Sequence, residues 1–379
     1  MKKLVVFGLI LALLLCGCGG KQAAAPAQTG EKEPAAENLQ SQEAPAAETE
    51  AAAETTEATE ATTVPTEPPV YRNPLNGEIL DAPFTGRVFA STISNMQENM
   101  PHVGVNHADV IMEMYVNMNN VVRCLALFTD IDAAEAVGST RSTRPIFNDI
   151  AQHYDLVLAH AGGSDTALND AAERGIDNFN VDSWVVAESG ASYRDTQYRR
   201  SYENSLFVAG PAFRAYAESQ GVAMELEKDY GFRFAEEGSP AAAGEDAAKI
   251  SMTMVYGQAK KDTAFVYHEE LGKYVWNQYG KEMKDQITDE PEAFTNVIIM
   301  QAGITNNGIY HAADFVSGGM GYYANGGKLI PIVWACDDED SAFRFMTTDA
   351  KPLEMAVGNT YIAVVTPESP VAWEAAAEA

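Results

Sequence analysis

Three arginines of this acidic chain stand at positions from which they could hold an anion together. Arg123 lies in the apolar run Val121–Phe128, and Arg141 and Arg144 lie three residues apart in the segment 138–145, GSTRSTRP. That spacing lets the last two share one face of a helical turn, and a helix starting beside them would add free backbone N–H groups. Guanidinium groups bind carboxylate or phosphate through paired hydrogen bonds. In the competing interpretation, these arginines pair with the chain's own carboxylates.

A second loop could complete this site. It reads HAGGSD over residues 160–165 and joins a predicted buried strand to a predicted helix. Its glycines allow a ligand to approach the backbone closely, and Ser164 is the expected N-cap. The competing interpretation is a capped helix with a histidine at the strand end. We expect the arginines, Ser139 and His160 to converge on one concave site. The candidate ligand-binding residues are Arg123, Ser139, Arg141, Arg144, His160, Ser164 and Asn204.

The common catalytic motifs are missing from the sequence. It contains no G-x-S-x-G, H-E-x-x-H, P-loop or G-x-G-x-x-G pattern. Its histidines and cysteines lack the spacing of a metal site, and the acidic run Asp337–Asp340 lacks the glycine and final glutamate of a calcium loop. We therefore assign no catalytic residue, no metal and no cofactor, and leave open whether the protein is an enzyme.

The first residues indicate the compartment. Lys2 and Lys3 precede the apolar run Leu4–Leu15, which is too short to span a bilayer because about 20 residues are needed. Gly17 and Cys18 follow, so residues 1–18 resemble a secretory signal with a bacterial lipobox. Cys18 would then carry the lipid anchor, with fatty acids such as palmitate, and become the mature N-terminus. We expect the protein at the outer face of the cell membrane; a plain N-terminal anchor is the alternative.

Residues 19–70 form a predicted disordered tether rich in Ala, Glu, Thr and Pro. The signal carries +2 and the tether −8, so −23 of the chain's net charge of −29 remains on residues 71–379. A body this acidic is a poor binder of nucleic acid or of anionic lipid surfaces. The expected partners are therefore the membrane, through the anchor, and a cell-wall precursor or envelope protein.

Apolar patterning divides the rest of the chain in two. Residues 71–237 predict an α/β or α+β domain with a mixed sheet, residues 238–246 a linker, residues 247–366 a mostly antiparallel β-rich domain, and residues 367–379 a tail. In the first domain, strands are expected at 88–93, 110–116, 121–128 and 155–160, and helices at 145–153, 164–174 and 211–220.

The second domain shows alternating strands. They are expected at 250–256, 296–301, 330–336, 342–346 and 360–365, with a hairpin turn at 325–328, NGGK. Cys124 and Cys336 lie in apolar runs of different predicted domains. We expect two buried thiols in separate sheets, without a disulfide between them.

The chain resembles the YerB-like lipoproteins of Gram-positive bacteria. The matching residues are Asn73–Gly77, Ile93–Asn95, Ala108–Val110, Glu113, Arg123, Gly138–Pro145, His160–Ser164, Asn204–Leu206, Asn296–Ile298, Ser317–Gly321, Trp334 and Gly358–Ile362. The likeness covers nearly all of residues 73–366. It departs at Tyr202 and Glu203, where family members show Pro-His, and at Ser139 and Thr140, where Pro-Val is usual. The resemblance implies an envelope lipoprotein with N- and C-terminal domains of uncharacterised function and no established catalytic residue.

Together these patterns predict a membrane-anchored extracytoplasmic lipoprotein that binds a small anionic ligand or an envelope partner. The alternative is a cell-envelope enzyme, a hydrolase or transferase, whose cleft is lined by the arginine and histidine loops. A purely structural interaction module is a third hypothesis, which an apolar surface patch without a polar pocket would favour.

Overall fold

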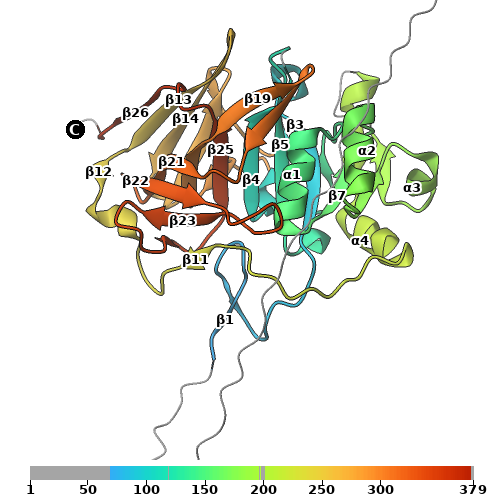
Figure 1. The fold of residues 1–379 in the computed structure, drawn as a ribbon, viewed down its shortest axis with the longest axis horizontal. Coiled ribbons are helices and arrows are strands. Elements are labelled where there is room, and N and C mark those ends of the chain that lie inside the picture. Colours follow the sequence, from blue (N-terminus) through green and yellow to red (C-terminus); the bar gives the residue numbers. More distant parts are fainter. Residues whose placement is uncertain (1–68, 118, 196, 198–200, 377–379) are drawn as a thin grey trace, which may run out of the picture. The chain divides into compact units, whose positions relative to one another are not determined.

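The computed structural model describes residues 69–117, 119–195, 197 and 201–376 (Figure 1). The predicted signal peptide, Cys18 and nearly all of the predicted tether lie outside these residues. Within the described ranges, no helix is long and apolar enough to cross a membrane. All elements below belong to one unit, residues 67–379.

An eleven-stranded mixed sheet runs through this unit in the order β12-β22-β21-β18-β25-β4-β5-β3-β7-β8, with β23 paired to β22. Neighbours are antiparallel except that β18–β25, β25–β4, β3–β7 and β7–β8 are parallel. We call it the central sheet. Its strands are β3 (Phe89–Ser94), β4 (Val110–Tyr115), β5 (Val122–Phe128), β7 (Val157–His160), β8 (Asn178–Asn180), β12 (Glu245–Asp246), β18 (Asn296–Gln301), β21 (Gly319–Asn325), β22 (Lys328–Ala335), β23 (Arg344–Thr347) and β25 (Thr360–Val365).

The central sheet joins the two predicted domains. Strand β25 of the second region pairs with β4 of the first, in a register that sets Thr360 opposite Val110 and Ala363 opposite Glu113. The predicted linker contains a short 3₁₀ helix, η5 (Pro240–Ala243), and strand β12, which pairs with β22. The predicted fold class is confirmed: a mixed sheet with few helices, followed by a mostly antiparallel strand-rich region.

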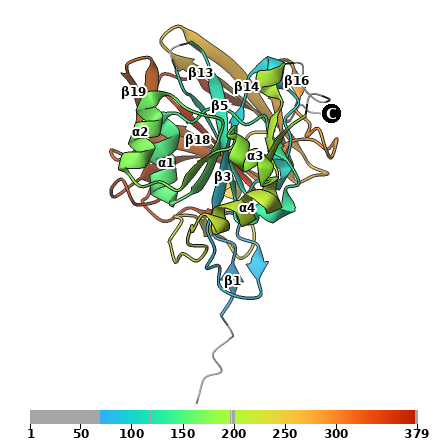
Figure 2. The same cartoon turned by 90° about the vertical axis from the view of Figure 1, so that its right-hand side faces the viewer.

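Helices cover both faces of the central sheet where its strands come from the N-terminal region of the chain. The helices are α1 (Pro145–Tyr154), α2 (Asp165–Glu173), α3 (Trp184–Glu188) and α4 (Gly210–Ser219). Phe147 of α1 belongs to the same core as Leu125 and Leu127 of β5, whereas Phe213 of α4 belongs to the core of the other face, with Cys124 and Phe128. Viewed end-on, α1 and α2 therefore lie on one side of β3 and α3 and α4 on the other (Figure 2). Strands buried on both faces explain the unbroken apolar runs of the sequence.

A six-stranded sheet packs against the central sheet. Its order is β16-β15-β14-β13-β26, with β17 paired to β15, and we call it the outer sheet. Its inner residues Ile250, Phe265 and Trp276 share a core with Tyr361 of β25. Its strands are β13 (Lys249–Tyr256), β14 (Ala259–His268), β15 (Lys273–Gln278), β16 (Lys281–Glu282), β17 (Ala293–Phe294) and β26 (Val371–Glu374).

Small sheets and 3₁₀ turns complete the described part of the chain. The remaining strands are β1 (Tyr71–Arg72), β2 (Ile79–Leu80), β6 (Val137–Gly138), β9 (Ser192–Arg194), β10 (Leu206–Val208), β11 (Arg233–Phe234), β19 (Gly303–Asn307), β20 (Tyr310–Asp314) and β24 (Glu354–Met355). They pair as β1–β2, β6–β10–β9, β11–β24 and β19–β20. The other 3₁₀ helices are η1 (Gln97–Asn99), η2 (Val105–His107), η3 (Ile131–Ala133) and η4 (Tyr202–Asn204).

The cysteine prediction is half right. Cys124 and Cys336 are buried and free, as expected. They do not lie in separate sheets, because Cys124 is in β5 and Cys336 directly follows β22 of the same central sheet. The error has a physical cause: pairing of β25 with β4 carries one sheet across both regions. The predicted hairpin turn is confirmed, with Asn325 opposite Lys328 and both intervening glycines at positive φ.

Candidate anion-binding site

Arg123 is the innermost member of the arginine cluster, which we define as Arg123, Arg141 and Arg144. It is the second residue of β5, opposite Ser94 of β3, and only 5% exposed. Its Nη1 donates to the carbonyl oxygen of Ser142 at 2.5 Å, which ties the strand to the arginine-bearing loop. Its buried Nε has no hydrogen-bond partner within the described ranges of the chain.

Backbone hydrogen bonds place the arginine-bearing loop over the end of β3. The Ser94 N–H donates to the Ser139 carbonyl at 3.0 Å, and the Arg141 N–H donates to the Thr92 carbonyl at 2.9 Å. Arg144 is then the extended N-cap residue of α1, and Pro145 takes the first helical position. The backbone of Arg141 is therefore held beside the end of β3, and that of Arg144 at the start of α1.

Arg144 lies against a residue that the sequence analysis missed. Its guanidinium carbon is 5.0 Å from the ring centre of Tyr310 in β20, a cation–π contact. Its Nη1 donates to the Thr143 carbonyl at 2.6 Å, and its buried Nε has no hydrogen-bond partner in the part of the chain that the structure describes. Tyr310 reaches the site through an isolated bridge to Asn117, just beyond the end of β4. No local pattern around Tyr310 signals this contact, because the two segments are far apart in sequence.

The three positive charges lie close enough to oppose one another. Burial lowers the pKa of Arg123 to about 9, and the charges of Arg144 and Arg141 add to that decrease. Burial also lowers the pKa of Arg144, where the nearby tyrosine opposes the shift and Arg141 adds to it. A bound anion would relieve this mutual repulsion.

The cluster has little negative charge of its own. Arg141 Nη2 lies 3.4 Å from Glu203 Oε2, and the Glu203 side chain is 78% exposed. Among the described residues, no carboxylate forms an ion pair with Arg123 or Arg144. Pairing with the chain's own carboxylates therefore accounts for Arg141 alone. This ion pair is exposed to solvent, and such pairs contribute little to folding stability.

Ser139 and Asn204 are hydrogen-bonded to each other and adjoin Arg141 of the cluster. Ser139 is 1% exposed, and its hydroxyl donates to the Asn204 carbonyl at 2.8 Å. The Asn204 side-chain oxygen accepts from Arg141 Nη1 at 3.5 Å, and the Glu203 carbonyl accepts from the same nitrogen at 2.5 Å. These residues orient Arg141, and the Ser139 hydroxyl is already engaged in this contact.

His160 and Ser164 lie beside the arginine-bearing loop, but their side chains are used elsewhere. The two loops are joined by the Ala161 N–H, which donates to the Arg141 carbonyl at 2.9 Å. The His160 ring is 1% exposed, with Nδ1 2.8 Å from the Gly162 carbonyl and Nε2 3.0 Å from Asn178 Oδ1. Burial lowers the pKa of His160. Ser164 Oγ accepts from the Ala167 N–H at 3.1 Å, the N-cap contact that the sequence predicts.

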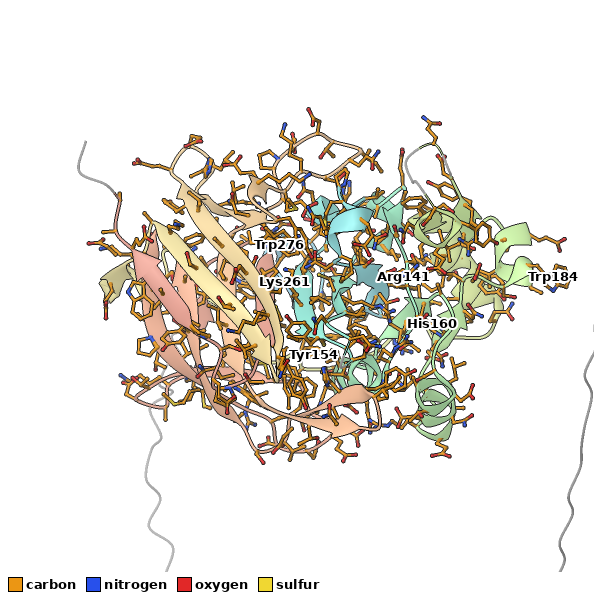
Figure 3. The ribbon with its side chains drawn as sticks, turned by 90° about the horizontal axis from the view of Figure 1, so that it is seen from above. Arg141, Tyr154, His160, Trp184, Lys261 and Trp276 are labelled. Atoms are coloured by element: carbon orange, nitrogen blue, oxygen red, sulfur yellow. The ribbon has the colours of Figure 1, made fainter. Side chains whose placement is uncertain are left out.

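The structure therefore brings the three arginines together, whereas the His160 ring is hydrogen-bonded to other residues. Figure 3 shows Arg141 and His160 in the half of the molecule that carries the helices. Both ring nitrogens of His160 lie within hydrogen-bond distance of groups of the fold, the Gly162 carbonyl and the Asn178 side chain, so the buried ring is already engaged there. The three guanidinium groups are thus neighbours, and His160 forms the end of a packed strand.

A second charged cluster is enclosed between the two sheets. Glu113 of β4 is fully buried and accepts from Lys261 Nζ of β14 at 2.7 Å. The Asn95 amide and the Tyr361 hydroxyl also donate to this carboxylate. Lys261 Nζ lies 5.9 Å from the ring centre of Trp276 of β15, and Figure 3 shows both residues on the outer sheet. This cluster joins the two sheets and is almost fully buried.

The first motif of the resemblance also has a structural role. Asn76 Nδ2 donates to Asp109 Oδ1 at 2.6 Å, and the Thr129 N–H and hydroxyl each donate to Asp109 Oδ2 at 2.7 Å. The Gly358 N–H donates to the Asn76 carbonyl at 2.8 Å. These bonds fasten the Asn73–Gly77 turn to the starts of β4 and β25.

The chain matches known proteins over most of its length. The N-terminal domain of a protein family of unknown function, DUF3048, matches residues 75–223, and its C-terminal domain matches residues 252–362. The protein described as "Putative lipoprotein YerB" of Bacillus subtilis (strain 168) is 24% identical over 309 residues, which are 76% of this chain and 86% of that protein.

The fold has a solved counterpart. The crystal structure of YerB protein from Bacillus subtilis superposes with a TM-score of 0.67 at 20% identity, covering 79% of this chain and 99% of that one. At this identity the match shows the fold alone. The two family domains correspond to the regions that meet at β4 and β25. The chain therefore belongs to the DUF3048 family, to which the resemblance to the YerB-like lipoproteins also leads.

Proposed function

We propose that this protein is a lipid-anchored binding protein at the outer face of the cell membrane, and that its arginine cluster holds a small anionic group. The observation that carries the proposal is the charge balance of the cluster. Among the described residues, one carboxylate, the exposed Glu203, pairs with the three neighbouring arginines, and it contacts Arg141 only, in a body whose net charge is −23. A folded chain so rich in acidic residues would be expected to neutralise these cations internally if their role were structural.

The free hydrogen-bond donors support the same proposal. The Nε atoms of Arg123 and Arg144 are buried and find no partner among the residues that the structure describes, and an unsatisfied buried donor destabilises the fold. A carboxylate or phosphate oxygen that reached either donor would form a charge-assisted hydrogen bond with it. Because the acidic body repels extended polyanions at long range, a compact anionic group is favoured. A cell-wall precursor or an envelope protein with such a group is the proposed class of partner.

The anchor belongs to the proposal as well. A relative is described as a lipoprotein, and Cys18 follows a lipobox-like sequence in this chain. Lipidation of Cys18 would hold the protein at the membrane, and the tether would give the folded unit reach above it. Its acidic, proline-rich composition favours an extended chain.

Ligand-induced stabilisation tests the site. The full-length lipidated protein in detergent is melted with and without inorganic phosphate or citrate, because a ligand that binds only the folded state raises the melting temperature. Arg144→Gln should abolish the shift. Arg144→Lys should reduce it, because lysine keeps the charge and loses the planar fork. Arg233→Gln is the matched control, since Arg233 is exposed and paired with Asp229.

The control and the variants separate the outcomes. An anion-dependent shift that survives Arg144→Gln, or that disappears equally in Arg233→Gln, contradicts the proposed site. The absence of a shift with either anion also contradicts it. A shift that is lost in Arg144→Gln and kept in Arg233→Gln supports it.

A further inference from the structure

The β19–β20 hairpin lies beside α1 and against the arginine cluster (Figure 1). Tyr310, the first residue of β20, has its ring centre 5.0 Å from the guanidinium carbon of Arg144. Tyr310 also lies near Arg123, because it opposes the decrease in the pKa of both arginines. The Nε atoms of the two arginines are buried. An anion that binds these donors therefore has to displace part of what covers them, and Tyr310 belongs to that cover.

The hairpin is fastened to the molecule more loosely than the arginine-bearing loop. Among the strands that the structure describes, β19 and β20 pair only with each other. Within the described ranges, one backbone hydrogen bond ties the hairpin to the segment after β4: the His311 N–H donates to the Val116 carbonyl at 3.3 Å. The arginine-bearing loop is instead bonded on two sides, because the Arg141 N–H donates to Thr92 and the Arg141 carbonyl accepts from Ala161. The hairpin is therefore the part of the cover that moves with the smallest loss of hydrogen bonds.

A hollow lies on the other side of the hairpin. It has a volume of about 770 Å³, and its lining includes Ile304 and Asn306 of β19 and Tyr256 at the end of β13. Asn306 stands opposite His311 in the register of the hairpin. Because successive side chains of a strand alternate between its two faces, this pair stands on the face opposite to the one that carries Tyr310. The hairpin therefore has space beside it on the side away from the arginines.

We propose that the β19–β20 hairpin is a lid on the anion-binding site, closed by Tyr310 in the empty protein and displaced when an anion binds. This inference rests on the proposed function of the arginine cluster. The face of an aromatic ring carries partial negative charge, so it attracts a guanidinium group and disfavours an anion. Tyr310 and an anion therefore compete for Arg144. The buried residues Ala302 and Phe315 hold the two ends of the hairpin, so the lid turns about them.

Two variants of Tyr310 test this competition. The affinity for inorganic phosphate is measured by calorimetric titration of the full-length protein in detergent. Tyr310→Ala removes the ring, so the affinity should rise about fivefold, the size of a partly buried cation–π contact. Tyr310→Phe keeps the ring and should keep the wild-type affinity. An unchanged affinity in Tyr310→Ala, or a weaker one in either variant, overturns the proposal, because Tyr310 would then be inert or part of the ligand site.

A reversible lock tests the movement of the hairpin. The bridge between Asn117 and Tyr310 sets Val116 opposite His311. Cα atoms of such a hydrogen-bonded pair are about 5.5 Å apart, a distance that a disulfide spans. In Val116→Cys, His311→Cys, oxidation ties the lid shut. Phosphate should then bind at least about tenfold more weakly than after reduction, because binding falls with the fraction of protein that can open. His311→Cys alone is the control and should bind equally before and after oxidation.

The outcomes separate the lid from the site. Loss of phosphate binding on oxidation that reduction restores supports the lid. Equal binding by the oxidised and reduced double variant overturns the lid and leaves the anion-binding site standing. An equal loss in the single variant overturns the lid as well. If the wild type binds no phosphate, the proposed function fails and the lid fails with it. Should the double variant not fold, the two Tyr310 variants decide.

Discussion

Replacing Lys261 by methionine tests the enclosed ion pair that joins the two sheets. Lys261 Nζ lies 2.7 Å from Glu113 Oε1, and the side chains are 6% and 0% exposed. Methionine keeps the length of the side chain and removes the charge, so Glu113 would stay buried without its cation. Removing one partner of a buried pair costs about 3–5 kcal/mol. Asn95 and Tyr361 still donate to the carboxylate, so we expect a loss near the lower end, about 3 kcal/mol.

Urea unfolding followed by tryptophan fluorescence measures this loss. The midpoint should fall in Lys261→Met while the slope stays the same, because the surface exposed on unfolding is unchanged. Adding Glu113→Gln removes the unpaired charge, so the double variant should recover about 1 kcal/mol or more relative to Lys261→Met. Lys351→Met, at an exposed lysine, is the control and should leave the midpoint in place.

Two results would refute this reasoning. One is a Lys261→Met variant that loses less than about 1 kcal/mol, since an exposed pair could lose as little. The other is a double variant that is less stable than Lys261→Met, because Glu113→Gln would then remove a favourable group rather than an unpaired charge. Either result would mean that the contact does not act as a buried ion pair.

Three further predictions concern the ends, the thiols and the pH dependence. Mass spectrometry of the membrane-extracted protein should find lipid on Cys18 as the first residue; an intact segment 1–15 or lipid on Cys16 would contradict this. Maleimide should label Cys124 and Cys336 in the denatured, unreduced protein and only slowly in the native one, where burial raises the pKa of both thiols; failure to label without reduction would indicate a disulfide. Burial raises the pKa of Asp149 to about 6 against the opposing charge of Arg174, so its protonated form stabilises the fold below about pH 4 and that contribution, at most about 3 kcal/mol, is lost as the pH rises through 6. In Asp149→Asn, the free energy of unfolding, measured by urea titration at each pH, should change less between pH 4 and pH 6 than in the wild type. An equal change in both proteins would contradict the assignment.

Local patterns predict the elements of this protein well. The apolar runs around Arg123 and before His160 become β5 and β7, and Ser164 caps α2 as its residue type predicts. These features depend on side-chain periodicity and on hydrogen bonds between residues a few positions apart. The same locality explains why the position of the arginine-bearing loop could be predicted from its flanking strands and helix.

Contacts between distant segments could not be predicted in the same way. Glu113 and Lys261 meet through the packing of two sheets, and Tyr310 meets Arg144 through a hairpin from the second region. The composition of residues 238–246 is typical of a linker, yet β25 and β4 pair in one sheet across it. Strand register between distant segments leaves no local signature, so single-sequence reasoning has nothing from which to infer it.

The most direct test of the arginine cluster observes its free donors. In full-length protein labelled with ¹⁵N-arginine, the Nε–H signals of Arg123 and Arg144 can be assigned with the Arg123→Lys and Arg144→Lys variants. Titration with inorganic phosphate should shift both signals together and saturate, while the signal of exposed Arg233 stays in place. If neither buried signal moves, or if Arg233 moves with the same dependence on phosphate, the cluster is not an anion-binding site.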